Sequence, residues 1–243
     1  MGYRRIRNRV LALTGAALVA GLASLAWPEP PLPETPVPLL RLSPDAGFSA
    51  ELVAQQPGLT PLPALVTGRV AAGAGPGAFL HEWPGLRAQA RFQGDAVSLR
   101  LNDDIDRWRV TLDGRAVEIA RPGPKDLRIA SLSPGPHEIR AERISEWHGP
   151  AEFGGFFLGP GATALPPPEP SSRLIEFIGD SDTVGFADTA RQRDCTSEQV
   201  FAATDTSLAF PAQVAQALGA DYRVIARSGI GLLRNADGLE PGR

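Results

Sequence analysis

The chain has 243 residues, of which 43% are hydrophobic and 21% are charged, and its formal net charge is -3. This composition supports a buried core and excludes a collagen, a coiled coil and a chain that is disordered throughout. A net acidic chain is a poor candidate for nucleic-acid binding. The 26 glycines and 24 prolines favour short strands and turns over long helices.

Cysteine and histidine are scarce in the sequence. Cys195 is the single cysteine, which excludes an internal disulfide and a zinc site built from several cysteines. The histidines are His81, His137 and His148, so none follows residue 148. We therefore expect no metal and no organic cofactor, and we expect these histidines to be strand or loop residues of the first half.

Residues 1–26 have the composition of an export signal. They carry four arginines and no acid, so the rest of the chain has 20 basic residues (24 minus 4) against 27 acidic ones. Val10 to Ala26 is an uncharged apolar run, and Ser24-Leu25-Ala26 fits a cleavage site. We expect export to the periplasm or the cell exterior. Retention of residues 10–26 as an inner-membrane anchor is the alternative.

Residues 27–63 are expected to form an extended, solvated spacer, because prolines crowd their first part. Alternating apolar and polar residues then predict an antiparallel β-sandwich of jelly-roll type over residues 64–160. Asp113-Gly114 predicts a hairpin turn within it. The clearest alternating runs are Ala88 to Phe92, Val97 to Leu101 and Trp108 to Leu112.

A second proline-rich linker is expected over residues 161–172, and the pattern changes after it. Leu174 to Ile178 predicts a strand, Ser207 to Leu218 a helix, and Tyr222 to Ala226 a second strand. Strand, helix and strand in this order predict an incomplete α/β layer over residues 173–243.

Gly179-Asp180-Ser181 directly follows the first of these strands. A serine at the carboxyl end of a parallel strand lies at the edge where such sheets bind ligands. The glycine permits a sharp turn, and the serine N–H can face a developing oxyanion.

Ile175 to Ser181 and the later Ile225 to Gly231 resemble the first two sequence blocks of the GDSL/SGNH hydrolases. The closer resemblance is to the acetyl esterases of carbohydrate esterase family 2, and it covers roughly residues 64–235. In the second half it includes Ser207-Leu208-Ala209-Phe210. In the first half it rests on Gly68-Arg69-Val70, Trp83-Pro84-Gly85, Phe92-Gln93-Gly94, Val110 to Gly114 and Pro134 to His137.

The resemblance implies a serine esterase that removes acetyl groups from a polysaccharide of the acetylxylan type. Ser181 would be the nucleophile, and its N–H would form the oxyanion hole together with that of Gly231, with Gly229 as the alternative. The family takes an oxyanion asparagine and a general-base histidine from later blocks, which this sequence lacks, and Asn235 comes too soon to replace the asparagine. The chain therefore looks C-terminally truncated and is expected to be nearly inactive alone.

Two other functions are compatible with the sequence. The sandwich resembles carbohydrate-binding modules, and Trp83, Trp108 and Trp147 are candidates for stacking on sugars, although Trp108 has the pattern of a core residue. The remaining alternative is an inactive, truncated gene product.

Asp182 departs from the family's sequence pattern. We expect its side chain to be solvated or paired with Arg227 or Arg234.

Overall fold

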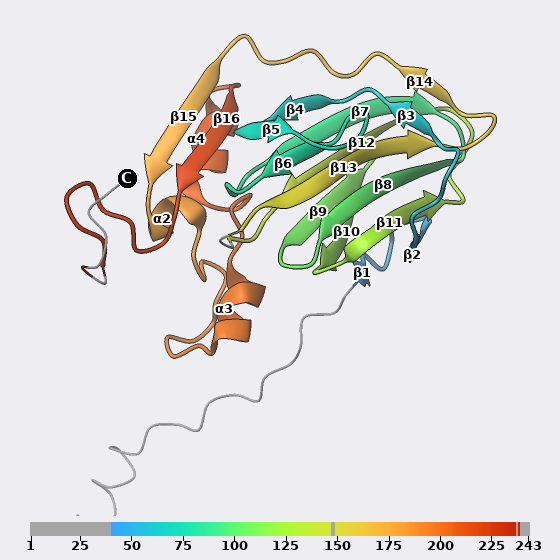
Figure 1. Cartoon of the computed structure of the whole chain (residues 1–243). Helices are drawn as coiled ribbons and strands as arrows, with labels where there is room; N and C mark the ends of the chain where they lie inside the picture. Colours follow the sequence, from blue (N-terminus) through green and yellow to red (C-terminus); the bar gives the residue numbers. More distant parts are fainter. Residues whose placement is uncertain (1–39, 147–148, 237, 239–243) are drawn as a thin grey trace, which may run out of the picture. The chain divides into compact units, whose positions relative to one another are not determined.

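The computed structural model describes residues 40–146, 149–236 and 238, which all belong to one compact unit, Glu34–Arg243 (Figure 1). The predicted export segment, the proline run before residue 39, Trp147 and His148 lie outside the described residues. Within the described part, no helix is long and apolar enough to cross a bilayer.

Two antiparallel sheets of seven strands each form a β-sandwich within the described residues. The first sheet contains β1 (Leu40–Leu42), β4 (Leu65–Thr67), β7 (Arg87–Gln93), β9 (Arg107–Leu112), β10 (Arg115–Ala120), β12 (Pro136–Arg143) and β14 (Thr163–Leu165). The second contains β2 (Ser49–Ala54), β3 (Thr60–Leu62), β5 (Val70–Ala72), β6 (Phe79–His81), β8 (Ala96–Asp103), β11 (Gly123–Ala130) and β13 (Ala151–Leu158). The predicted antiparallel sandwich is thus confirmed, while its jelly-roll connectivity stays a prediction.

The strand orders are β1-β10-β9-β12-β7-β14 and β2-β11-β8-β13-β6-β5, with β4 beside β7 and β3 beside β13. One side of each strand faces the core because side chains alternate along a strand. Trp108, Phe92 and Phe153 are at most 1% exposed, and they join residues of both sheets in one apolar cluster. Trp108 is therefore a core residue, as its pattern predicted.

Residues 40–62 do not form the predicted spacer. Strands β1, β2 and β3 pair with β10, β11 and β13. The prediction failed because prolines dominated the composition, whereas Leu40, Leu42 and Leu52 pack against the core. Pro61 is tolerated since β3 pairs on one side only.

The predicted linker over residues 161–172 is also wrong in part. Residues Thr163–Leu165 form β14, a short strand that pairs with β7 at the margin of the first sheet. Only residues 166–173 connect the sandwich to the next element without helix or strand.

The last part of the described chain combines a parallel strand pair with three short helices. Its elements are β15 (Leu174–Gly179), α2 (Ser181–Val184), α3 (Ser197–Ala203), α4 (Phe210–Ala217) and β16 (Asp221–Ala226). Both predicted strands are present, and the predicted helix begins three residues late, with Pro211 in its first turn. Helix α3 was not predicted. That this layer is an incomplete α/β domain stays a prediction.

A cluster of charged groups is buried at one end of the sandwich. Arg143 and Asp106 are both unexposed and form an ion pair of 2.9 Å. The Ser145 hydroxyl donates to Asp106 over 2.9 Å. The indole of Trp108 donates to Asp103 over 2.7 Å. Burial raises the pKa of the Asp106 carboxyl to about 7, against the opposing effect of Arg143.

This pKa predicts a distinct pH dependence of stability. An unfolded aspartate titrates near pH ~3.9, so the folded chain holds the extra proton between about pH 4 and 7. The contribution of the Asp106 proton to the free energy of unfolding is complete below that window. As the pH rises through the window, the contribution falls by no more than about 1.4 kcal/mol per pH unit, and above the window it no longer changes. Urea unfolding measures the free energy of unfolding of the wild type and of Asp106→Asn. The wild-type value minus the variant value should fall from pH 4.5 to 7.

Asp104→Asn is the matched control, because Asp104 is exposed two residues away and should leave the wild-type profile unchanged. A difference that instead grew toward pH 7 would mean that Arg143 keeps the Asp106 carboxylate ionised in the folded state.

Candidate active site

The parallel pairing of β15 with β16 brings the two motifs to one sheet edge. Gly179 is in register with Ala226, and the Arg227 N–H donates to the Gly179 carbonyl over 3.4 Å. Asp180-Ser181 and Arg227-Ser228 therefore leave the sheet at the same carboxyl edge, where α/β sheets bind ligands. The structure brings together the two blocks that the sequence singled out.

Ser181 is the first residue of α2, and its backbone is fixed on both sides. The Asp180 carboxylate accepts from the Asp182 N–H over 3.3 Å, and the Ser181 carbonyl accepts from the N–H groups of Gly185 and Phe186, each over 3.0 Å. A Cβ at Gly179 would collide with the Thr183 hydroxyl. Only glycine therefore fits the turn that presents the serine.

The Ser181 side chain is half-buried, and among the described residues its hydroxyl has no hydrogen-bonding partner. A serine hydroxyl without a base is a weak nucleophile. The geometry around Ser181 thus provides a placed hydroxyl, and the described part of the chain provides no group that would activate it.

Both described histidines are structural, as predicted. The ring of His137 lies between the Asp113 carboxylate, 2.6 Å from Nδ1, and the Ser133 carbonyl, 2.8 Å from Nε2. His81 is buried edge-on against Trp108 with ring centres 5.2 Å apart, and burial holds its pKa well below the usual value. Neither ring is available to Ser181.

The two candidate glycines differ in what their N–H groups do. The Gly231 N–H donates to the side-chain oxygen of Asn235 over 3.2 Å. The N–H of Gly229 has no acceptor within the described residues, although its carbonyl accepts from Ala236 over 2.8 Å. Gly229 adopts φ +81°, a conformation that favours glycine. Of the two, Gly229 is thus the one whose N–H is not used by another described residue, and the choice between them as oxyanion donor stays a prediction.

Glu146 is a site residue that sequence reasoning missed. It lies in the connection between β12 and β13, and its carboxylate accepts from both the N–H and the hydroxyl of Ser228, each over 2.5 Å. These charge-assisted bonds fix the start of the loop that carries Gly229 and Gly231. No local sequence signal could reveal them, since the partners are 82 residues apart.

Arg107 and Arg109 of β9 hold the segment between α3 and α4. The Arg107 guanidinium donates to the carbonyls of Phe201, Ala202 and Thr204 over 3.0, 2.8 and 3.0 Å. A cation at a helix C-terminus also interacts favourably with the helix dipole. Arg109 donates to Asp205 over 2.6 Å, and Ser207 accepts another of its hydrogen bonds.

Strand β16 is attached to the sandwich through Tyr222 and Asp221. The Tyr222 hydroxyl donates to Glu142 of β12 over 3.0 Å, and Arg87 of β7 lies 5.3 Å from the centre of its ring. The same Arg87 donates to Asp221 over 2.5 Å. Burial and the Glu142 charge both raise the pKa of Tyr222, so this hydroxyl remains a donor.

Asp182 is exposed and forms no ion pair within the described part of the chain, which agrees with the expectation of a solvated side chain. The Cys195 thiol donates to the Gln192 carbonyl over 3.4 Å and is free. With both described histidines bound elsewhere, nothing described assigns this thiol a chemical role.

Comparison with known proteins finds similarity to carbohydrate esterases. Residues 66–168 match the carbohydrate esterase 2 N-terminal family. The chain is 38% identical over 186 residues to an acetylxylan esterase / glucomannan deacetylase of Cellvibrio japonicus, covering 74% of this chain and 51% of that protein. It is 28% identical over 163 residues to the cellulase/esterase CelE of Acetivibrio thermocellus, covering 64% of this chain and 19% of that protein.

Solved structures give the same result. A carbohydrate esterase whose active site displays divergent catalytic and non-catalytic binding functions superposes with a TM-score of 0.67 at 35% identity, over 75% of this chain and 54% of that one. A family 2 carbohydrate esterase of Clostridium thermocellum in complex with cellohexaose gives 0.64 at 26% identity, over 73% and 55%. The chain is thus similar to the family 2 carbohydrate esterases, and its residues 66–168 match the family model of their N-terminal part. It spans about half the length of the Cellvibrio relative.

The Glu146 contact predicts that the sandwich orders the loop after β16. Removing a charged acceptor from a hydrogen bond costs about 1.5–3 kcal/mol, so amide exchange of Ser228 should become about 10- to 100-fold faster in Glu146→Ala. Glu146→Gln, which keeps an acceptor but not the charge, should show a smaller change. Hydrogen exchange followed by NMR measures both.

Glu82→Gln is the control for this prediction, since Glu82 is an exposed carboxylate of the sandwich without a partner among the described residues. Unchanged protection of Ser228 in Glu146→Ala would show that the loop is ordered by its own turn instead.

Proposed function

We propose that this chain carries the nucleophile of a serine esterase that removes acetyl groups from polysaccharide. The observation that supports this most directly is the fixed turn at Gly179, which presents Ser181 at the carboxyl edge of a parallel strand pair. That edge stands beside a sandwich related to the N-terminal domain of carbohydrate esterases. Fold alone would not license a function, and here the site and the family agree.

The proposed reaction begins with attack of the Ser181 hydroxyl on the acetyl carbonyl while a general base accepts its proton. The N–H groups of Ser181 and Gly229 stabilise the tetrahedral oxyanion, with Gly231 as the alternative donor. Collapse of this intermediate breaks the bond between the acetyl carbon and the sugar oxygen and leaves the acetyl group on Ser181. The leaving sugar oxygen accepts the proton from the base and becomes a hydroxyl. Water then hydrolyses the acetyl-enzyme by the same route.

The base and a side-chain oxyanion donor must come from outside the described residues. His81 and His137 are both bound elsewhere, and Asn235 is occupied by Gly231. In the family, a histidine and an asparagine of later sequence blocks have these roles. We infer that an active protein supplies both groups from residues beyond those described.

The proposed substrate is an acetylated polysaccharide of the acetylxylan type. Its support is the name of the Cellvibrio relative, an acetylxylan esterase / glucomannan deacetylase, and the cellohexaose bound in a related structure. We also propose export to the periplasm or the cell exterior, guided by residues 1–26, with membrane attachment only if residues 10–26 are retained.

Two proteins test the proposal with 4-nitrophenyl acetate. The 243-residue chain should hydrolyse it at nearly the background rate, because general-base help contributes about 10²- to 10⁴-fold and one oxyanion donor about 10²- to 10³-fold. A chimera in which the residues of the Cellvibrio relative that come after its match to this chain are joined to Asn235 of this chain should be active. Ser181→Ala should lower the chimera's rate of hydrolysis by about 10³-fold or more.

Ser172→Ala is the matched control, since Ser172 is exposed just before β15 and should leave the chimera's rate unchanged. Activity that survives Ser181→Ala would refute the assignment of the nucleophile. A robust rate in the 243-residue chain that Ser181→Ala removes would show that its own residues supply the base.

A further inference from the structure

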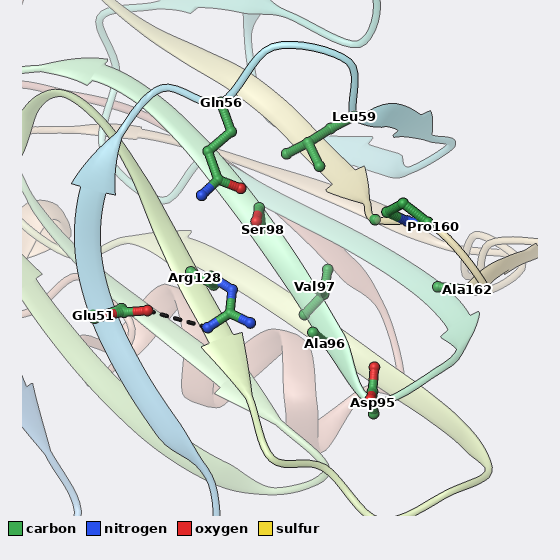
Figure 2. Close-up of a pocket in the computed structure, with 11 residues that line it drawn as sticks. Glu51, Gln56, Leu59, Asp95, Ala96, Val97, Ser98, Arg128, Pro160 and Ala162 are labelled. Atoms are coloured by element: carbon green, nitrogen blue, oxygen red, sulfur yellow. Dashed lines mark hydrogen bonds and ion pairs between the residues drawn. The ribbon is translucent and has the colours of Figure 1, made fainter.

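A pocket of about 510 Å³ opens on the outer face of the second sheet (Figure 2). Its floor is the first part of β8, from Ala96 to Ser98. The connection between β2 and β3 contributes Gln56 and Leu59 on one side, and residues 159–162, between β13 and β14, contribute the other. A volume of this size accommodates a small organic ligand.

Strand register explains why polar groups gather there. Arg128 of β11 is paired with Glu51 of β2 on one side and with Ser98 of β8 on the other. Their neighbours Leu127 and Leu99 are core residues. Because side chains alternate along a strand, Glu51, Arg128 and Ser98 all point to the outer face. Two members of this row, Glu51 and Arg128, form an ion pair of 3.1 Å, which Figure 2 shows.

Several polar side chains in the pocket lack a protein partner. Within the described residues, the side chains of Gln56, Asp95 and Ser98 make no hydrogen bond. Ser98 as a residue is 7% exposed, but its unpaired hydroxyl is not one of the fully buried polar atoms of the described residues. The hydroxyl is therefore open to solvent on the pocket floor and is free to bind water or a ligand.

The lining defines the chemistry of that ligand. Ser98 and Gln56 both donate and accept, Arg128 donates, and Glu51 and Asp95 accept. A ligand rich in hydroxyls, each of which donates and accepts, meets all five groups. Two carboxylates against one guanidinium disfavour an anion. Leu59, Pro160 and Ala162 add apolar surface for C–H groups.

We propose that this pocket binds one ring of a neutral saccharide, as a non-catalytic site on the sandwich. Among the described residues, none that lines the pocket is aromatic, so the ring is held by hydrogen bonds at its edges and not by stacking. The proposal does not depend on esterase activity, because none of its residues belongs to the β15–β16 edge.

The experiment is a titration of the whole 243-residue chain, labelled with ¹⁵N, with cellohexaose, xylohexaose and mannohexaose. At least one of the three should shift the backbone signal of Ser98 and the side-chain amide of Gln56 in a saturable manner. The double variant Gln56→Ala/Ser98→Ala should bind that sugar at least tenfold more weakly. Trigalacturonate, an anionic saccharide, should bind at least tenfold more weakly than the neutral one.

Two controls separate this site from the candidate active site. Lys125→Ala removes an exposed cation three residues before Arg128 on β11 and should change the affinity less than twofold. Ser181→Ala should not change it at all. No saturable shift with any neutral sugar, or an affinity that the double variant leaves unchanged, would overturn the proposal. So would equally tight binding of trigalacturonate. Matched circular dichroism spectra show that the variants are folded.

Discussion

The candidate active site depends on two neighbouring arginines of the sandwich. Arg107 is 7% exposed, and burial lowers the pKa of its guanidinium while the charges of Glu118 and Asp205 oppose the effect, so these partners offset part of the cost of burying the charge. The Arg107 guanidinium donates hydrogen bonds to three carbonyls at the end of α3. This helix has seven residues and is too short to be stable alone. The apolar cluster of the last layer holds five buried residues. Much of the order of that layer therefore comes from the sandwich.

The effect of these arginines reaches Ser181 through a short series of hydrogen bonds. Arg109 holds Asp205, whose N–H donates to the Gly185 carbonyl over 3.3 Å. The next residue, Thr206, donates its hydroxyl to the Val184 carbonyl over 2.8 Å and its N–H to Ile144 of the sandwich over 3.0 Å. Val184 and Gly185 are the end of α2. The short helix that begins with the candidate nucleophile is thus tied at its other end to the sandwich.

Local patterns and distant contacts explain which features the sequence could predict. The hairpin at Asp113-Gly114 follows from alternation and turn chemistry within a dozen residues, and it joins β9 to β10 as expected. Ser181 was singled out by a motif that spans a single turn. Strand β2 was missed because its partner, β11, follows about 75 residues later, and helix α3 because its capping arginine precedes it by about 95. Glu146 has no local signal of any kind.

The buried charges of the sandwich help to position the candidate site. Buried ion pairs add little net stability, because desolvation offsets much of the attraction. The pair of Asp106 and Arg143 nevertheless belongs to a network that holds the backbone at Ser145 in place. The Ser145 hydroxyl donates to Asp106 and accepts from the Arg107 N–H over 2.8 Å. Ser145 directly precedes Glu146, the residue that holds the Ser228 loop. The polar cluster therefore orients the connection from which the sandwich reaches the candidate site, a result that an apolar core of equal volume would not give. By this argument the sandwich is a structural part of the site as much as a domain beside it.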